Sequence, residues 1–113
     1  MLIKKEQSKL IKNSEFCSVR EYNFPYKELG IAIAEIDGRY PDEGKVVNEK
    51  CDEIYYVLSG SAIVHIEDKD FEINEGDALY IEKGKLYWVE ANKLKIVAPT
   101  APAWFFEQNK KIK

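Results

Sequence analysis

The sequence predicts an all-β fold, a sandwich or a jelly-roll barrel, in a single domain. Short runs of apolar, aromatic and β-branched residues follow one another along the chain, and turn-forming residues separate them. About eight such runs occur at regular spacing, and no segment has the periodicity of a long helix. The length of 113 residues is enough for one hydrophobic core and leaves no room for a second.

The first half of the chain contains two predicted strands and one predicted loop. Residues 16–22 alternate loosely, and residues 29–36 form a clearer strand that the turn pair Asp37-Gly38 is expected to end. The polar segment 39–50 is predicted to be a loop. Segment 8–13 is either a short strand or a helical turn, and the sequence does not decide between them.

The second half predicts a denser series of strands. The strongest one is 53–58, and the pair Ser59-Gly60 is expected to turn the chain into the next. Pro99 and Pro102 are expected to close the regular region, because proline donates no hydrogen bond to a sheet. The further strands are predicted at 61–67, 71–73, 78–81, 86–90 and 94–98.

Charge and cysteine content exclude several classes of partner. The chain has 17 basic and 20 acidic residues and a net charge of −3, which does not suit nucleic acid or an anionic membrane. The polar N-terminus lacks the apolar core of a signal peptide, and no apolar run approaches the roughly 20 residues of a membrane span. Cys17 and Cys51 form no CxxC motif and are expected to be reduced thiols in a cytoplasmic protein. The lysines at positions 110, 111 and 113 are expected to form a solvated tail.

Two segments carry a family resemblance. Glu53 precedes Gly60 by seven positions, and Gly76 precedes Gly84 by eight. This spacing resembles the two signatures of the cupin superfamily, G-x5-H-x-H-x3/4-E-x6-G and G-x5-P-x-G-x2-H-x3-N. The glycines fit, whereas the Pro, His and Asn positions of the second signature are occupied by Glu82, Tyr87 and Ala91.

The resemblance implies a small cupin jelly-roll β-barrel of the RmlC-like type over residues 28–100. Residues 1–27 would then supply N-terminal strands that pack on the barrel. Residues 101–113 would form a C-terminal aromatic segment and a basic tail. Small cupins commonly pair through one sheet, so the resemblance also implies a homodimer.

The metal ligands of the family are largely missing from this chain. Cupins that use a metal typically bind it with three histidines and the glutamate of the first signature. Here the glutamate is Glu53, and the last histidine is replaced by Tyr87. The first two histidine positions fall on Val46 and Asn48 with a four-residue gap, or on Val47 and Glu49 with a three-residue gap. We therefore expect no metal and no other cofactor, because these residues offer too few suitable ligands.

Glu53 and Tyr87 are the predicted catalytic residues. A carboxyl group inside the barrel would be an acid/base group or an anchor for a substrate hydroxyl, or else a structural carboxylate bonded to Tyr87. Tyr87 would be a proton donor, or would simply fill the space of a lost metal. Strand alternation places Tyr55 and Val57 on the face of Glu53, and Val89 on the face of Tyr87, with Trp88 opposite. The predicted ligand-binding residues are Arg39, Asn48, Glu49, Tyr55, Val57 and Val89.

Four other features have two interpretations each. Arg39 is either a ligand-binding cation at the barrel mouth or an exposed turn residue. His65, the only histidine, is expected at the surface or in an interface. Cys51 is either a reactive or a buried thiol. The apolar run 104–106 either closes the barrel end or packs against a second subunit.

Three functions remain open from the sequence. The first is a metal-independent domain that binds a small polar ligand, a sugar or an organic acid, since tyrosine-rich walls suit rings. The second is a metal-free enzyme resembling the cupin epimerases and isomerases, with Glu53 and Tyr87 as its acid/base groups. The third is an atypical metal-dependent cupin enzyme that uses Glu49, Glu53 and Tyr87. We rank binding first, because no histidine is placed to act as a base.

Overall fold

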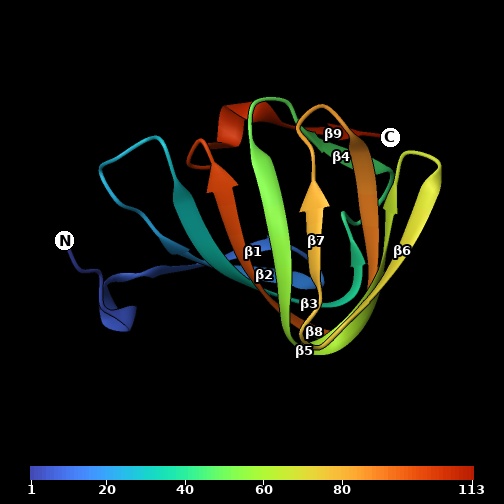
Figure 1. Cartoon of the computed structure of the whole chain (residues 1–113), viewed down its shortest axis with the longest axis horizontal. Helices are drawn as coiled ribbons and strands as arrows, with labels where there is room; N and C mark the ends of the chain where they lie inside the picture. Colours follow the sequence, from blue (N-terminus) through green and yellow to red (C-terminus); the bar gives the residue numbers. More distant parts are fainter.

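The computed structural model describes residues 1–113 and consists almost entirely of β-strands (Figure 1). Two 3₁₀ helices are the only helical elements, and neither has the length or the apolar character of a membrane span. The helices are η1 (Lys5–Gln7) and η2 (Phe106–Gln108). The strands are β1 (Lys9–Ser14), β2 (Cys17–Tyr22), β3 (Gly30–Tyr40), β4 (Lys45–Asn48), β5 (Asp52–Ile66), β6 (Lys69–Asn74), β7 (Ala78–Ile81), β8 (Leu86–Ala101) and β9 (Asn109–Ile112).

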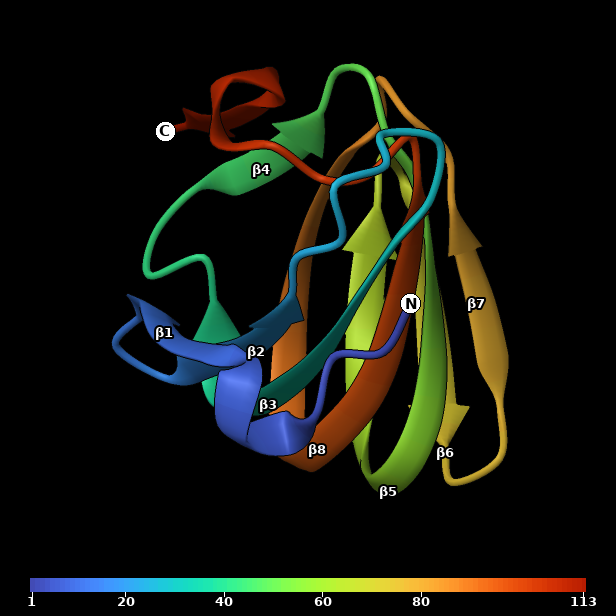
Figure 2. The ribbon, with the colours of Figure 1, turned by 90° about the vertical axis from the view of Figure 1, so that its left-hand side faces the viewer.

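All strands pair antiparallel in one sheet that curls on itself. Its main path is β1-β2-β3-β8-β4-β9, and β5 pairs with β6, β7 and β8. The two longest strands, β5 and β8, pair from Asp52↔Ala101 to Ile66↔Tyr87. Figure 2 shows the sheet folding over, so that β1–β4 lie across from β5–β7 with the interior between them. The fold is thus the predicted all-β jelly-roll barrel.

The core lies inside the curl and follows strand alternation. In β5 the inward positions include Tyr55 and Val57, and in β8 they include Tyr87 and Val89. Trp88 lies on the opposite face, as predicted. Burial of large apolar side chains from both halves of the curl supplies the main driving force for folding. The fully buried members include Ile36, Val46, Val64, Ile81, Leu94 and Ile96.

Two predicted turns are wrong, because both are irregularities inside longer strands. The register of β3 against β8 shifts between Ile36 and Gly38, and that of β5 shifts on both sides of Ser59. Gly38 and Gly60 have φ angles of 130° and 79°. A glycine with positive φ serves a tight turn and a β-bulge equally well, so the sequence signal for the two is the same.

Three further expectations need correction. The predicted loop 39–50 contains the end of β3 and all of β4. Pro99 does not end the regular region but pairs with Ile31 inside β8. The three lysines of the C-terminal tail are exposed as predicted, but most of the tail forms β9 on β4, and the Lys113 ammonium lies 3.1 Å from the Glu43 carboxylate. Segment 8–13, left undecided above, belongs mainly to β1.

Gly60 offers a test of the long-strand architecture. A Cβ added there would overlap the carbonyl oxygen of Lys93 on the paired strand, whereas one added at Gly84 meets nothing within 4 Å. Both glycines have similar φ angles, 79° and 83°, so the conformational strain is matched. We expect Gly60→Ala to lower the free energy of unfolding by about 2 kcal/mol more than Gly84→Ala, measured by urea denaturation. Equal losses would contradict the close approach of β5 and β8 at this bulge.

Candidate functional site

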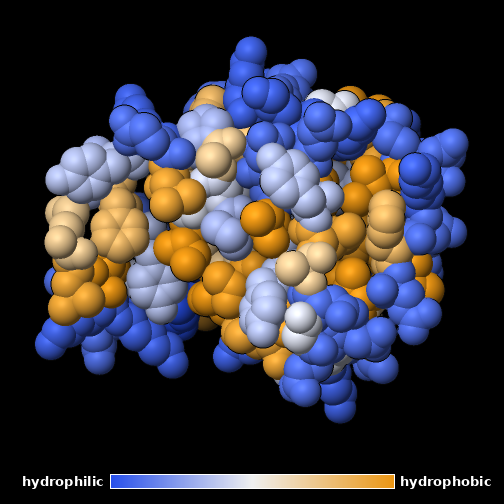
Figure 3. All heavy atoms as spheres, viewed as in Figure 1, coloured by the Kyte–Doolittle hydropathy of each residue, from blue (hydrophilic) through white to orange (hydrophobic).

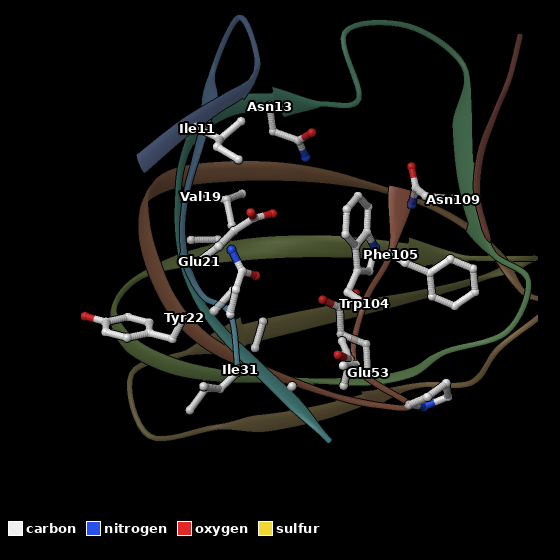
Figure 4. A pocket seen from close by; sticks show the side chains of 18 of the residues that line it. Ile11, Asn13, Val19, Glu21, Tyr22, Ile31, Glu53, Trp104, Phe105 and Asn109 are labelled. Atoms are coloured by element: carbon white, nitrogen blue, oxygen red, sulfur yellow. The ribbon is translucent and has the colours of Figure 1, made fainter. Parts of the chain in front are cut away.

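A cavity of about 680 Å³ occupies the interior of the barrel. Its walls come from β1, β2, β3, β5 and β8, from the loop between β2 and β3, and from the C-terminal segment after β8. In Figure 4, Trp104 and Glu53 lie across the cavity from Ile11, Val19 and Glu21 of the β1–β2 hairpin. The lining is mainly apolar with a few polar groups, which is the usual composition of a small-molecule site.

Glu53 is the acidic group at the base of this cavity. Its Oε1 accepts a hydrogen bond from Asn48 Nδ2 at 3.1 Å and a longer one from the Tyr87 hydroxyl at 3.4 Å. Glu53 sits near the start of β5, between Ile81 of β7 and Thr100 of β8. The side chain is therefore enclosed by three strands but keeps part of its surface open to the cavity.

Tyrosines surround this carboxyl group. The rings of Tyr55 and Tyr87 meet edge to face with their centroids 6.4 Å apart. Tyr40 also lines the cavity, and its hydroxyl oxygen accepts a hydrogen bond from Asn13 Nδ2 at 3.3 Å. All three tyrosines are buried. The base of the cavity thus offers hydroxyl groups and one carboxyl group, a set suited to a hydroxylated ligand.

Burial sets the protonation of these groups. Removal from water raises the pKa of Glu53 from 4.5 to about 7, because the hydrogen bonds from Asn48 and Tyr87 offset only part of the desolvation. Burial also raises the pKa of Tyr87 and Tyr55 well above 10. At neutral pH, both protonation states of Glu53 are therefore populated, while the tyrosines stay as neutral O–H donors.

Asn48 links Glu53 to the C-terminal segment. Its side-chain oxygen accepts hydrogen bonds from Trp104 Nε1 at 3.2 Å, Gln108 Nε2 at 3.0 Å and Asn109 Nδ2 at 2.9 Å. Asn48 is 2% exposed. The segment that follows β8 is thus tied to the floor of the site by three donors to a single oxygen.

The structure brings together about half of the residues predicted for the site. Glu53, Tyr55 and Tyr87 line the cavity. Asn48 does not line the cavity but donates a hydrogen bond to Glu53. Val57 and Val89 are fully buried core residues that do not reach the cavity, and Glu49 is exposed outside it. Arg39 does not line the cavity either. Its guanidinium donates to the carbonyl oxygens of Pro41 at 2.6 Å and Gly44 at 2.8 Å and lies over the Trp88 ring.

The structure also decides between the interpretations of His65, Cys51 and the apolar run 104–106. His65 lies on the outer face, stacked on Trp88 with ring centroids 4.0 Å apart and bonded to Asp70 and Glu90 at 2.6 Å each. Burial raises the pKa of the Cys51 thiol, so the buried interpretation of that residue applies. Trp104 lines the cavity and closes that side of the barrel, whereas Phe106 is exposed.

Sequence reasoning missed several residues of the site. Tyr40, Cys17 and Asn13 line the cavity, and the buried Gln108 holds Asn48. Alternation along 16–22 and 29–36 could have placed residues of those strands inside. Gln108 and Asn109 gave no signal, because their role depends on the C-terminal segment returning beside β4.

The residues around Glu53 do not fit the metal that the resemblance implies. Asn48 points its amide nitrogen, a donor, at the carboxylate, and Val46 of the same strand has no ligand atom. No group of three or more His, Cys, Asp or Glu side chains is arranged to hold a metal ion, and the single histidine is on the outer face. One carboxylate with neutral tyrosines does not make a transition-metal site.

The buried carboxyl group predicts a specific pH dependence of stability. Between pH 4.5 and about 7 the native protein keeps a proton that the unfolded chain releases, so stability falls as pH rises through this window. Glu53→Gln accepts the same hydrogen bonds without ionising. We expect the variant to match the wild type at pH 4 and to exceed it by about 3 kcal/mol at pH 8, measured by urea denaturation. The other titrating groups contribute equally to both proteins, so they cancel when the two free energies of unfolding are subtracted. If the difference between variant and wild type did not change between pH 4 and pH 8, the raised pKa of Glu53 would be contradicted.

Comparisons with known proteins agree with this architecture. A uridine complex of a Pac13 variant from Streptomyces superposes with a TM-score of 0.89 at 13% identity, covering 100% of this chain and 90% of that one. KdgF from Halomonas sp. gives 0.73 at 15% identity, over 92% and 96% of the two chains. A variant of Bacillus subtilis oxalate decarboxylase gives 0.76 at 17% identity, over 93% of this chain and 30% of that one.

At these identities the likeness establishes the fold alone. No curated protein matches the sequence significantly. The family model for the cupin domain matches residues 41–98, a little more than half of the chain. This match, together with the jelly-roll barrel and the spacing of Glu53 and the glycines, shows that the chain belongs to the cupin family.

Proposed function

We propose that this cupin domain binds a small uncharged, hydroxylated molecule in its barrel and moves a proton on it without a metal. The observation that carries the proposal is Glu53, a carboxyl group with a pKa of about 7 that faces a cavity of about 680 Å³. A group whose pKa lies near neutrality serves equally well as a base and as an acid. This geometry favours the enzymatic alternative over the purely binding domain that the sequence ranks first.

The arrangement of donors suggests which step Glu53 performs. As a carboxylate it would accept a proton from a carbon next to a carbonyl group of the ligand. The buried hydroxyls of Tyr40 and Tyr55 would offer hydrogen bonds to the oxygen that becomes negative, while Tyr87 donates to Glu53. Protonated Glu53 would then return the proton in one of two ways. In an isomerisation the proton would go to the former carbonyl carbon, while the proton of the neighbouring hydroxyl group passes to the former carbonyl oxygen. In a dehydration it would go to a hydroxyl group on the next carbon, which leaves as water as the carbon–carbon double bond forms. Pac13, whose fold this chain shares, is described as a nucleoside dehydratase.

The charges of the lining support an uncharged ligand. Three carboxylates, of Glu21, Glu53 and Glu107, line the cavity against one ammonium group, that of Lys27. Neither arginine nor histidine is present in the lining, so no planar donor is available for a phosphate or a carboxylate. A sugar or nucleoside therefore suits the site better than an organic acid. Aromatic side chains from Phe24 and Trp104 in the lining provide surfaces on which a flat ring can pack.

The predicted homodimer fits a feature of the outer surface. Apolar side chains gather on the face shown in Figure 3, over β3, β8, β5 and β7. In β5, Tyr56 and Leu58 alternate with the inward-facing Tyr55 and Val57, and each is at least 40% exposed. Such a face would suit the sheet pairing that is common among small cupins, which stays a prediction here.

Proton transfer can be tested without knowing the product. In deuterated buffer, we expect the wild type to exchange a carbon-bound proton next to the carbonyl of a suitable substrate in a panel of aldehyde- and ketone-bearing sugars and nucleosides, detected by proton NMR. Glu53→Gln should slow the exchange about 100-fold or more, and EDTA should leave it unchanged. Phe71→Leu, on the outer strand β6, is the matched control. Tight binding of a panel member with no exchange by any form would instead support the binding domain.

Ligand charge can be tested by binding. We expect uridine to raise the melting temperature of the protein more than uridine 5′-monophosphate does, because the phosphate meets three carboxylates and one lysine. In a double variant with Glu21→Gln and Glu107→Gln, the difference between the melting-temperature increases caused by the two ligands should be smaller. A stronger effect of the monophosphate on the wild type would contradict a site for uncharged ligands.

A further inference from the structure

The two oxygens of the Glu53 carboxyl group have different surroundings. Oε1 accepts both hydrogen bonds described above, from Asn48 Nδ2 and from the Tyr87 hydroxyl. Oε2 has no hydrogen-bond partner in the protein, yet it is not one of the enclosed, unpaired polar atoms of the fold. Since Glu53 lines the cavity, Oε2 is the oxygen that faces a ligand.

The orientation of Asn48 is fixed by groups that can only donate. The side-chain oxygen of Gln108 accepts hydrogen bonds from the main-chain N–H groups of Lys50 at 3.1 Å and Cys51 at 3.2 Å. Main-chain N–H groups never accept, so the oxygen of the Gln108 amide must lie on that side. Its nitrogen then faces Asn48, 3.0 Å from Oδ1.

A second donor gives the same answer for Asn48. The indole nitrogen of Trp104 can donate but not accept, and it lies 3.2 Å from the same Asn48 oxygen. Asn48 therefore has its oxygen toward the C-terminal segment and its nitrogen toward Glu53. With the amide reversed, its oxygen would face Oε1 and repel the carboxylate.

We propose that Gln108 and Asn48 form an amide relay that holds Oε1 of Glu53 and leaves Oε2 as the atom that exchanges protons with the ligand. Both amides are positioning residues, and Gln108 is 2% exposed and outside the cavity lining. The relay begins at main-chain groups of Lys50 and Cys51, which cannot reverse. The proposal rests on the acid/base role of Glu53, but its test uses no substrate.

Gln108→Glu is designed to reverse the relay. A carboxylate at this position still accepts from Lys50 and Cys51, but its second oxygen faces Oδ1 of Asn48, where a donor is required. The Asn48 amide should then turn over, losing its hydrogen bond from the Trp104 indole, and Glu53 should lose one donor. Gln7→Glu is the matched control, since Gln7 lies in η1 and its side-chain oxygen likewise accepts a main-chain hydrogen bond. Gln108→Met removes the donor without adding charge.

The readout is NMR titration of the Glu53 carboxyl carbon and of the Asn48 side-chain amide. In the wild type we expect both signals to move with one midpoint near 7. Gln108→Glu should raise the Glu53 pKa by at least about one unit and abolish the titration of the Asn48 amide protons. Gln108→Met should raise the pKa by less, and Gln7→Glu should change neither signal. If the new charge acted only through electrostatics, the midpoint of the Glu53 titration would shift, but the Asn48 amide signal would still change as Glu53 ionises.

Two results would overturn the relay. One is a wild-type Asn48 amide that does not respond as Glu53 ionises, a measurement that needs no variant to fold. The other is a folded Gln108→Glu protein whose Glu53 titrates as in the wild type. Neither result would contradict the acid/base role of Glu53, which the deuterium-exchange experiment tests separately. Conversely, a failed exchange experiment would not contradict the hydrogen bonds of the relay.

Discussion

The interior of this barrel depends on how it accommodates one carboxyl group. Glu53 is enclosed by β5, β7 and β8, where an ionised and unpaired carboxylate would be costly. Two donors from Asn48 and Tyr87 reduce that penalty without removing it, and the pKa settles at about 7. The same compromise that lets the fold tolerate the acid underlies the proton transfer that we propose for it. Glu53 therefore affects both the stability of the fold and the proposed proton transfer.

Two long strands make this arrangement possible. β5 and β8 pair along nearly their whole length, and their bulges at Ser59-Gly60 and near Lys93 let the sheet bend without ending. One half of β8 delivers Tyr87 to the interior, and the other half forms the wall beside Glu53. The C-terminal segment then adds Trp104 and Gln108 to the same region. Elements from both ends of the sequence therefore define one small site.

The sequence was informative where local pattern and spacing carry the information. Alternation along 53–58 correctly placed Glu53 with Tyr55, and the spacing of the glycines correctly indicated the cupin barrel. Bulges were mistaken for turns at Gly38 and Gly60, because a glycine with positive φ is common to both. Arg39 was assigned to the mouth, since no local signal shows that its guanidinium bonds to carbonyls of the chain segment just after it. The Gln108 contact depends on chain return over some sixty residues, which no local pattern encodes.

The position of the two tryptophans on opposite sides of the barrel wall has a practical value. Trp104 borders the cavity and donates to Asn48, whereas Trp88 lies outside against Arg39 and His65. These are the only two indoles of the chain. Each is thus an intrinsic fluorophore in a separate environment. The emission of Trp104 should respond to a ligand in the cavity, and that of Trp88 to protonation of His65. Emission from single-tryptophan forms would distinguish events inside the barrel from events on its surface without an added label.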